Sequence, residues 1–95
     1  MARLGMDVEV VTQHGTALKN IGDHDIPSLL HRVDNLVNEI QGNWWGPDAQ
    51  HFHASWTGTD RPALQGIAHE ISTFGQQALT NAQRQAQTSA ATGSV

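Results

Sequence analysis

Histidine is the residue type in this chain that is best suited to metal binding or acid–base chemistry. The 95 residues include six histidines and no cysteine. Two histidines on one helix can share a metal ion when they lie three or four positions apart, because that spacing brings them to one face. His51 and His53 lie two positions apart, so a helix points them about 200° from each other. His24 and His31 are two turns apart. The spacing predicts no metal site and no cofactor, and it favours histidines that face solvent or a partner.

Acid–base and nucleophilic chemistry find no better support. The run Asp23-His24-Asp25 has suitable residue types, but neighbouring side chains at a helix end diverge, so helix capping and solvation explain the run better. No glycine-bracketed nucleophile turn surrounds a serine, and there is no glycine-rich phosphate loop. The serines considered are Ser28, Ser55 and Ser72. The sequence therefore predicts no catalytic residue and no enzyme.

Charge and hydropathy exclude two further classes of partner. The formal net charge is −4 with neutral histidines, and the five basic residues are scattered. A nucleic-acid-binding protein needs a basic face, so we expect no nucleic acid. No apolar run approaches the roughly 20 residues of a membrane span. The N-terminus lacks the apolar core of a signal peptide. We therefore expect a cytoplasmic protein, or one exported by a route that recognises the folded chain.

The apolar residues between positions 26 and 44 follow a helical period. At about 100° per residue they fall within an arc of about 120°, while the polar residues and glycines fall outside it. A strand is excluded because the period is not two. The stripe consists of Ile26, Leu29, Leu30, Val33, Leu36, Val37, Ile40 and Trp44. This pattern predicts an amphipathic helix.

Glycine and proline interrupt this helix near residues 22–27, although apolar residues upstream continue close to the same stripe. Asp25 stands where an N-cap would stand, and Pro27 is tolerated in a first turn. Proline also disfavours helical backbone at the residue before it. The pattern predicts one long helix over about 7–42 with a kink near 22–27, and two helices in line are the alternative.

The strongest turn signal follows, at residues 43–47 within the run Gly42-Asn43-Trp44-Trp45-Gly46-Pro47-Asp48. Gly46 can adopt a positive φ without steric cost, and Asp48 is a candidate cap for a second helix. We expect Trp44 to pack at the tip against the start of that helix, where burying an aromatic ring stabilises by about 2–3 kcal/mol. The alternative to a binding role for the tryptophans is a structural one, in which they close the end of the hydrophobic core.

A second amphipathic helix is predicted over about 48–87. Its apolar positions recur every 11 residues, a spacing that keeps to one face of a nearly straight helix. The two series are Phe52/Ala63/Phe74 and Trp56/Ile67/Ala78. Asp60 is another candidate cap, with Pro62 in the first turn. Residues 88–95 have no charge and almost no large apolar side chain, which predicts a disordered tail.

Two long helices joined by a short turn run antiparallel. The predicted fold is therefore all-α, an antiparallel two-helix hairpin forming a single domain over residues 1–95. The predicted hairpin core is Leu29, Val33, Leu36, Ile40, Phe52, Trp56, Ile67 and Phe74. The candidate partner face is Val10, Ile21, Leu64 and Leu79. Because a two-helix rod has no third layer to cover that face, we expect dimerisation into a four-helix bundle with helices crossing near 20°.

A Trp-x-Gly motif, Trp44-x-Gly46 with Trp45 in the variable position, lies at the midpoint between the two predicted helices. Downstream come Gly46-Pro47-Asp48-Ala49-x-x-Phe52-x-x-x-Trp56 and Arg61-Pro62-Ala63-Leu64. In these motifs and in its two-helix pattern, the chain resembles the WXG superfamily of early-secreted-antigen-like proteins of type VII secretion. The resemblance covers nearly the whole chain.

The resemblance implies a non-enzymatic protein that is exported from the cytoplasm without a cleaved signal peptide, as a folded dimer. Its partner would be itself, which is the simpler expectation, or a paralogous hairpin. The resemblance also implies contact with the membrane ATPase of the secretion system or with a larger co-secreted protein.

The sequence departs from the family in its export signal. The usual Tyr-x-x-x-Asp/Glu is missing, since the chain has no tyrosine and no Asp or Glu after Glu70. The chain then depends on a partner that carries the signal, or acts as the export partner or chaperone of another substrate. A cytoplasmic helical adaptor or structural interaction module unrelated to secretion is the alternative.

Overall fold

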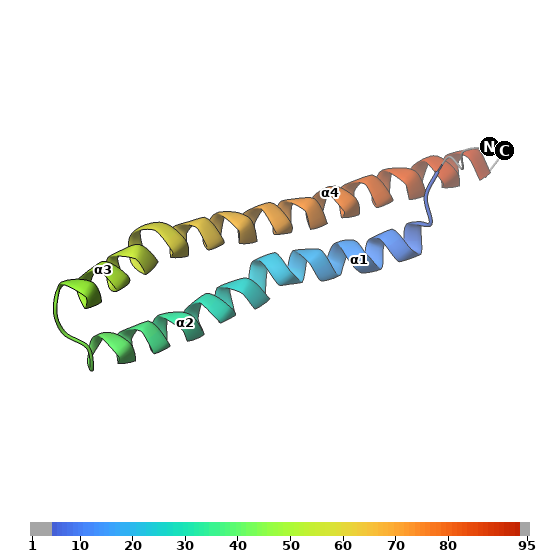
Figure 1. Ribbon diagram of the computed structural model, residues 1–95. Coiled ribbons are helices and arrows are strands. Elements are labelled where there is room, and N and C mark those ends of the chain that lie inside the picture. Colours follow the sequence, from blue (N-terminus) through green and yellow to red (C-terminus); the bar gives the residue numbers. More distant parts are fainter. Residues whose placement is uncertain (1–4, 94–95) are drawn as a thin grey trace.

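The computed structural model describes residues 5–93, with side chains described through Thr88, and shows an all-α helical hairpin (Figure 1). The first rod consists of α1 (Val8–Asn20), η1 (Ile21–Asp25) and α2 (Ile26–Gln41). The second rod consists of α3 (Pro47–Ser55), η2 (Trp56–Asp60) and α4 (Arg61–Gly93). The two rods run antiparallel, and the molecule extends over 73 × 22 × 19 Å. No strand occurs in the described part of the chain.

Local capping explains where the two rods begin. Asp7 caps α1, because its side chain accepts a hydrogen bond from the backbone N–H of Val10 at 3.2 Å. Gly46 stands at the N-cap of α3 with φ 113° and ψ 179°, so the predicted positive φ is confirmed. Pro47 opens the first turn of α3. Asp48, expected as the cap, lies inside that first turn, where its negative charge favours the helix N-terminus.

Each rod contains one five-residue π-helical turn, η1 or η2, just before a residue followed by proline. A proline within a helix collides with the carbonyl four residues earlier and has no N–H to donate. The wider π turn relieves this collision. Its i→i+5 hydrogen bonds run from the N–H of Ile26 to the carbonyl of Ile21, and from the N–H of Arg61 to the carbonyl of Trp56. Both rods thus pass their prolines without breaking.

These π turns decide between the alternatives for the first rod. The rod is one continuous helix that changes geometry within the predicted kink region, and it is not two separate helices. The expected caps Asp25 and Asp60 are therefore wrong. Asp25 has helical backbone angles and makes no capping hydrogen bond, and Asp60 lies inside η2.

The contact between the rods is built largely from glycine and alanine. On the first rod the buried residues are Gly15, Gly22, Leu30 and Val37. On the second rod they are Ala49, Ala68, Gly75 and Ala82. Within α4 these positions recur every seven residues, which is the repeat of a two-helix seam. On the first rod one spacing is eight instead of seven, and it spans η1, because a π turn adds one residue to the helix.

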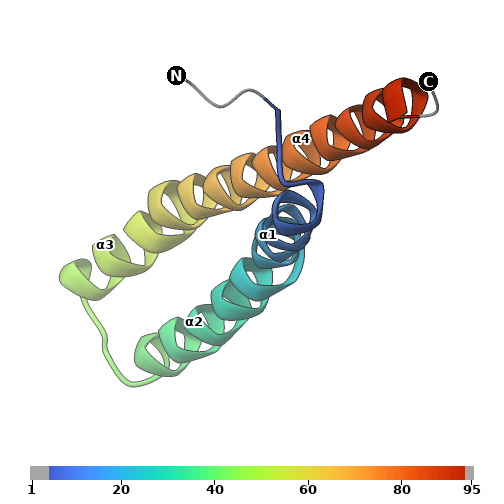
Figure 2. The same cartoon turned by 90° about the vertical axis from the view of Figure 1, so that its right-hand side faces the viewer.

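The small residues allow the two backbones to touch. A Cβ atom added at Gly22 would lie 2.4 Å from the carbonyl oxygen of Ala68 and 2.5 Å from the backbone nitrogen of Ser72. One added at Gly75 would lie 2.5 Å from the backbone nitrogen of Lys19. The rods accordingly lie closest where α1 runs beside α4, and they diverge toward the loop (Figures 1 and 2).

This close approach overturns most of the predicted hairpin core. Of its eight members, only Val33 and Trp56 are half-buried. The others are exposed, namely Leu29, Leu36, Ile40, Phe52, Ile67 and Phe74. Helices that meet backbone to backbone leave little room for large side chains between them, so most of these side chains lie on the flanks. The prediction located the apolar stripe but assigned the centre of the contact to the wrong part of it.

Two further expectations need correction. Leu79, predicted on the partner face, is half-buried, and its Cδ2 atom lies 3.3 Å from the Cβ position of Gly15, so it packs between the rods. The predicted tail is also wrong for residues 88–93, because α4 continues to Gly93. That segment is rich in alanine and contains no proline, so nothing in it breaks a helix. Residues 94–95 lie outside the described residues.

Two glycine-to-alanine substitutions on α4 test the close approach. Gly75→Ala places a methyl group against the backbone of α1, so we expect the free energy of unfolding to fall by about 1–3 kcal/mol. Gly66→Ala is the matched control, because its Cβ would meet nothing within 4 Å. Alanine has the higher helix propensity, so this variant should gain about 0.5–1 kcal/mol. Urea unfolding measures both changes, and equal effects would contradict the proposed packing.

Candidate functional site

The large exposed apolar side chains of the helices define the candidate site. On the first rod they are Val10, Leu18, Ile21, Leu29, Leu36 and Ile40. On the second rod they are Phe52, Leu64, Ile67 and Phe74. We call this set the apolar face. It includes three of the four residues predicted for a partner face and six of the eight predicted for the core.

Helical geometry places all of these residues on one side of the hairpin. Leu36 precedes the buried Val37 by one residue, and Phe74 precedes the buried Gly75 by one residue. One residue turns a helix by about 100°, so each side chain stands to one side of the contact between the rods. Because the rods are antiparallel, the same displacement along both sequences leads to the same side of the hairpin. The apolar residues of both rods therefore form one surface.

The opposite side of the hairpin is polar. The residues that follow buried positions by one are Asp23, His31, Asn38, His69 and Gln76. A shallow groove between the rods on this side is lined in part by Asp23, His31, Gln65 and His69. The hairpin is thus a two-sided rod, with one apolar and one polar surface.

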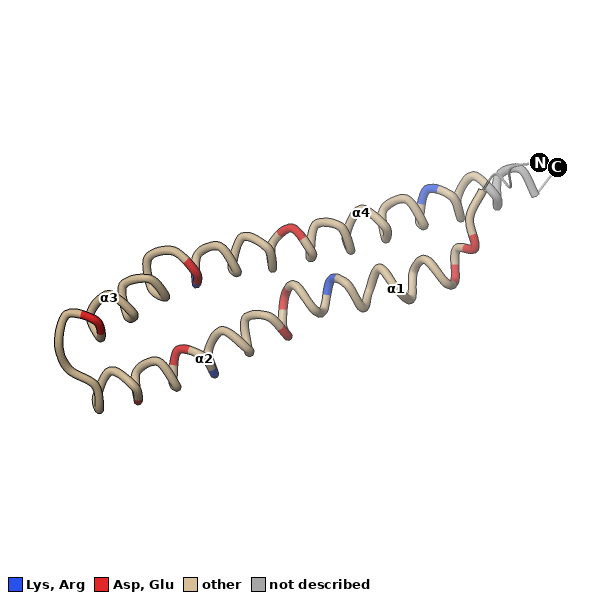
Figure 3. Tube along the Cα trace, in the orientation of Figure 1, with Lys and Arg blue, Asp and Glu red and all other residues tan. Residues whose placement is uncertain are grey.

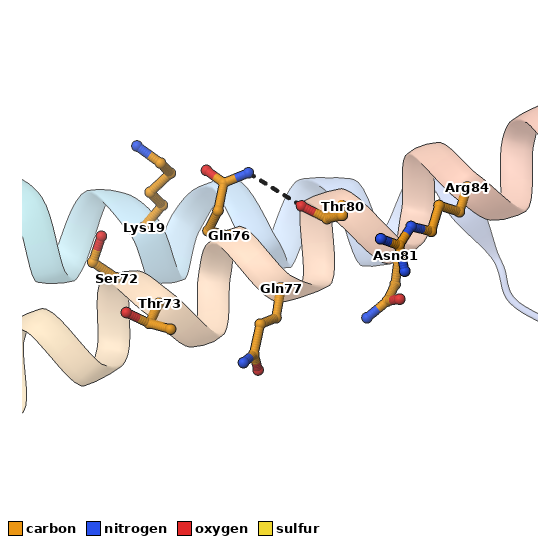
Figure 4. A pocket seen from close by; sticks show the side chains of 8 residues that line it. All are labelled: Lys19, Ser72, Thr73, Gln76, Gln77, Thr80, Asn81 and Arg84. Atoms are coloured by element: carbon orange, nitrogen blue, oxygen red, sulfur yellow. Dashed lines mark hydrogen bonds between the residues drawn. The ribbon is translucent and has the colours of Figure 1, made fainter.

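A second groove runs beside α1 and α4 and is lined by hydroxyl and amide side chains, with one basic group at each end, Lys19 and Arg84 (Figure 4). Gln76 and Thr80 share a hydrogen bond of 3.4 Å. Gln77 and Asn81 point away from Lys19 in the view of Figure 4. These side chains do not converge on a common point, so the groove resembles a solvated helix surface more than a ligand site.

The loop extends the apolar surface to the tip of the hairpin. The ring of Trp44 packs on that of Phe52 in α3, with ring centroids 5.5 Å apart and a tilt of 51°. The expected contact with the start of the second helix is therefore confirmed, although 41% of Trp44 remains exposed. Trp45 is 80% exposed and makes the hairpin tip strongly aromatic.

A polar cluster around Asp34 joins the rods on the loop side of the glycine contact. The indole N–H of Trp56 donates to Oδ1 of Asp34 at 2.9 Å. The guanidinium Nε of Arg61 lies 2.9 Å from Oδ1 and 2.8 Å from Oδ2 of the same carboxylate. These bonds connect α2 with η2 and with the start of α4. The hydrogen bond from Trp56, and then the one from Arg61, lower the pKa of Asp34 from its ordinary value.

A second carboxylate, that of Asp23, also joins the two rods, near the glycine contact. The hydroxyl of Ser72 in α4 donates to Asp23 in η1, and Lys19 forms an ion pair with Asp23 at 3.0 Å. The hydrogen bond from Ser72, followed by that from Lys19, lowers the pKa of Asp23. Neither cluster was foreseen from the sequence, because the residues that join one rod to the other lie far apart in the chain. The one available signal was Trp56, whose N–H needs an acceptor when the ring is half-buried.

The part of the chain that the structure describes brings together no constellation with metal chemistry. Within residues 5–93, no group of three or more His, Cys, Asp or Glu side chains is placed to hold a metal ion. No helix of this region combines the length and the apolar character needed to cross a membrane. No protein-family model, curated protein or solved structure matches the chain.

The two bound carboxylates predict how stability depends on pH. A carboxylate whose pKa is lower in the folded state releases its proton more readily there than in the unfolded chain. Its contribution is complete above the ordinary aspartate pKa and is lost as the pH falls through the lower folded-state value. We expect Asp34→Asn to lower the urea midpoint at pH 7 and to flatten its acid dependence. Glu70→Gln, which removes an exposed carboxylate that has no bonded partner among the described side chains, should leave both unchanged.

The two tip tryptophans should differ in their contribution to stability. Trp44→Ala removes the contact with Phe52, so we expect the free energy of unfolding to fall by about 1–2 kcal/mol. Trp45→Ala removes a ring that is mostly in water, so the change should stay within about 0.5 kcal/mol. Thermal unfolding compares them directly. A larger loss for Trp45→Ala would show that the packing of the tip is misassigned.

Proposed function

We propose that this chain is a non-enzymatic protein of type VII secretion that works as one half of a four-helix bundle. The observation that carries the proposal is the apolar face on a long two-helix rod. The Trp44-x-Gly46 turn supports the assignment to the WXG superfamily, since Gly46 adopts a positive φ there and Trp44 packs on the second rod. The hairpin shape agrees with the fold that this resemblance implies.

The apolar face favours a second hairpin as its partner. It runs from Val10 to Ile40 on the first rod and from Phe52 to Phe74 on the second, so a small ligand or a single short peptide would leave most of it in water. Exposed apolar surface of this extent usually marks an interface with another protein. A second two-helix rod placed on it would complete a four-helix bundle and leave the polar sides of both hairpins in solvent. Dimerisation thus gives the apolar side chains a core that the single chain lacks.

The proposed cellular role follows from the family resemblance. The chain leaves the cytoplasm without a cleaved signal peptide, as a folded dimer. In the absence of the Tyr-x-x-x-Asp/Glu signal, the partner supplies recognition by the membrane ATPase, or this chain acts as the chaperone of that partner. Its presence in culture medium should then require the secretion ATPase. Retention in the cell irrespective of the ATPase, together with intact dimerisation, would favour the adaptor function.

A pair of substitutions on α2 tests whether the apolar face is the interface. Leu36 is 63% exposed, so Leu36→Glu should cost the isolated hairpin little stability while placing a charge in the bundle core. We expect at least a tenfold weaker association by analytical ultracentrifugation. Asn38→Glu adds the same charge on the polar side and should leave association unchanged. Phe74→Glu and Gln76→Glu form the corresponding pair on α4. If neither Leu36→Glu nor Phe74→Glu weakens association, the apolar face is not the interface.

A further inference from the structure

Two parallel apolar ridges run along α2, and one of them faces the second rod. Leu30 and Val37 form the buried ridge, with 3% and 6% of their surface exposed. Leu29 and Leu36 form the other ridge, one residue earlier, and are 54% and 63% exposed. Both pairs have the seven-residue spacing of a two-helix contact. Hydrophobicity and spacing therefore allow two registers of α2, which differ by a rotation of about 100° about its axis.

The π turn η1 determines which of the two ridges faces the second rod. Seven residues after the buried Gly22, a regular α-helix would bring Leu29 to the contact, whereas the π turn adds one residue and brings Leu30 there. If an α-helix replaced η1, Leu29 and Leu36 would turn toward the second rod. The first rod would also lengthen by about 1.5 Å, a shift that the exposed loop after Gln41 can absorb. This alternative register thus keeps an apolar ridge of α2 in contact.

Pro27 works against the alternative register. In a regular α-helix its ring would collide with the carbonyl of Asp23, four residues earlier. The wider turn of η1 avoids that collision, and it is closed by the i→i+5 hydrogen bond from the N–H of Ile26 to the carbonyl of Ile21. Because π turns are otherwise rare, a regular α-helix is the expected form of this segment once the proline is removed.

Asp34 fixes the rotation of α2 directly. Its carboxylate accepts hydrogen bonds from the indole of Trp56 and the guanidinium of Arg61, both on the second rod. Figure 3 shows acidic and basic residues on α2 and around the junction of η2 with α4, the two segments that this cluster joins. In the alternative register Val33 would occupy the place of Asp34 and offer no acceptor. Two half-buried donors would then lose their partner, which is unfavourable.

The register of α2 also determines whether the hairpin has two different sides. In the alternative register Leu36 would leave the apolar face, and Asn35 would take its place. Val37 would move from the contact to the polar side. The apolar face would lose its α2 ridge, and the polar side would gain exposed apolar groups.

We propose that Pro27 and Asp34 act together as a register lock. The lock holds the Leu30/Val37 ridge against the second rod and thereby keeps Leu29 and Leu36 on the apolar face. Either residue alone is sufficient, because Pro27 blocks the regular helix and Asp34 fixes the rotation of α2. When both are removed, η1 becomes a regular α-helix and α2 turns to the alternative register. The lock is a property of the single hairpin and does not require the proposed function.

Cysteine labelling measures this rotation, because the chain contains no cysteine of its own. Leu36→Cys and Val37→Cys are introduced separately into the wild-type chain and into Pro27→Ala/Asp34→Ala. Their rates of reaction with a maleimide are compared at a concentration where analytical ultracentrifugation shows a monomer. In the wild-type chain we expect the thiol at position 36 to react at least tenfold faster than the thiol at position 37. In the double variant the order should reverse.

Two controls separate rotation from other effects of the substitutions. Pro27→Ala/Glu39→Ala removes an exposed carboxylate of α2 in place of Asp34, so it should keep the wild-type order of rates. Each single variant, Pro27→Ala or Asp34→Ala, should keep it as well. Circular dichroism should show a cooperative thermal transition for every variant.

A deletion provides a second test of the same register. Removing His24 from Pro27→Ala/Asp34→Ala makes Leu30 the seventh residue after Gly22. A regular α-helix then brings Leu30 and Val37 back to the second rod. The wild-type order of labelling rates should return.

Four results would overturn the proposal. The first is the wild-type order of rates in Pro27→Ala/Asp34→Ala. The second is fast reaction at both positions, or loss of the cooperative transition, which would show that α2 leaves the second rod instead of turning. The third is reversal in Pro27→Ala/Glu39→Ala, which would show that Asp34 takes no part. The fourth is a deletion variant that does not recover the wild-type order.

Discussion

Backbone contact of α1 and η1 with α4 is the constraint on which the rest of this molecule depends. Gly22 and Gly75 remove the side chains that would hold the helices apart, so each helix meets the main chain of the other. Such an interface is narrow, and it is satisfied by glycine, alanine and a few larger residues such as Leu30 and Val37. The large apolar side chains consequently lie beside the contact instead of within it. A tight seam between the rods and an exposed apolar surface are thus two results of the same packing.

The π turns preserve this contact where the chain contains proline. Gly22 and Leu30 are eight residues apart, whereas the other neighbouring buried positions of this rod are seven apart. If a regular α-helix replaced η1, the additional residue would rotate α2, and Leu30 and Val37 would leave the contact between the rods. The polar clusters then join the rods at two levels. Asp23 links η1 to α4 beside the glycine contact, and Asp34 links α2 to the start of α4 closer to the loop. Specific hydrogen bonds therefore supplement a seam whose small side chains bury little apolar area.

The hairpin that results is a two-sided rod with one polar and one apolar surface. Its polar side resembles an ordinary solvated helix surface, and its apolar side continues to the aromatic tip at Trp44 and Phe52. The seam between the rods and the apolar face are therefore formed by different residues of the same helices.

The sequence by itself determined the secondary structure and the overall shape, because these depend on local properties. Helical periodicity gave two amphipathic helices, and the Gly46-Pro47 pair located the turn and the positive φ between them. Tertiary structure decided which part of each apolar stripe faces the other rod. An apolar stripe about 120° wide is wider than the surface that one neighbouring helix covers. Hydrophobicity therefore cannot predict whether Leu29 or Leu30 is the residue buried against the other rod. That choice depends on how near the backbones approach, which the glycines of one helix determine only when they meet small residues of the other. The same dependence on distant residues hid the contacts of Asp34 with Trp56, since 22 positions separate them along the chain.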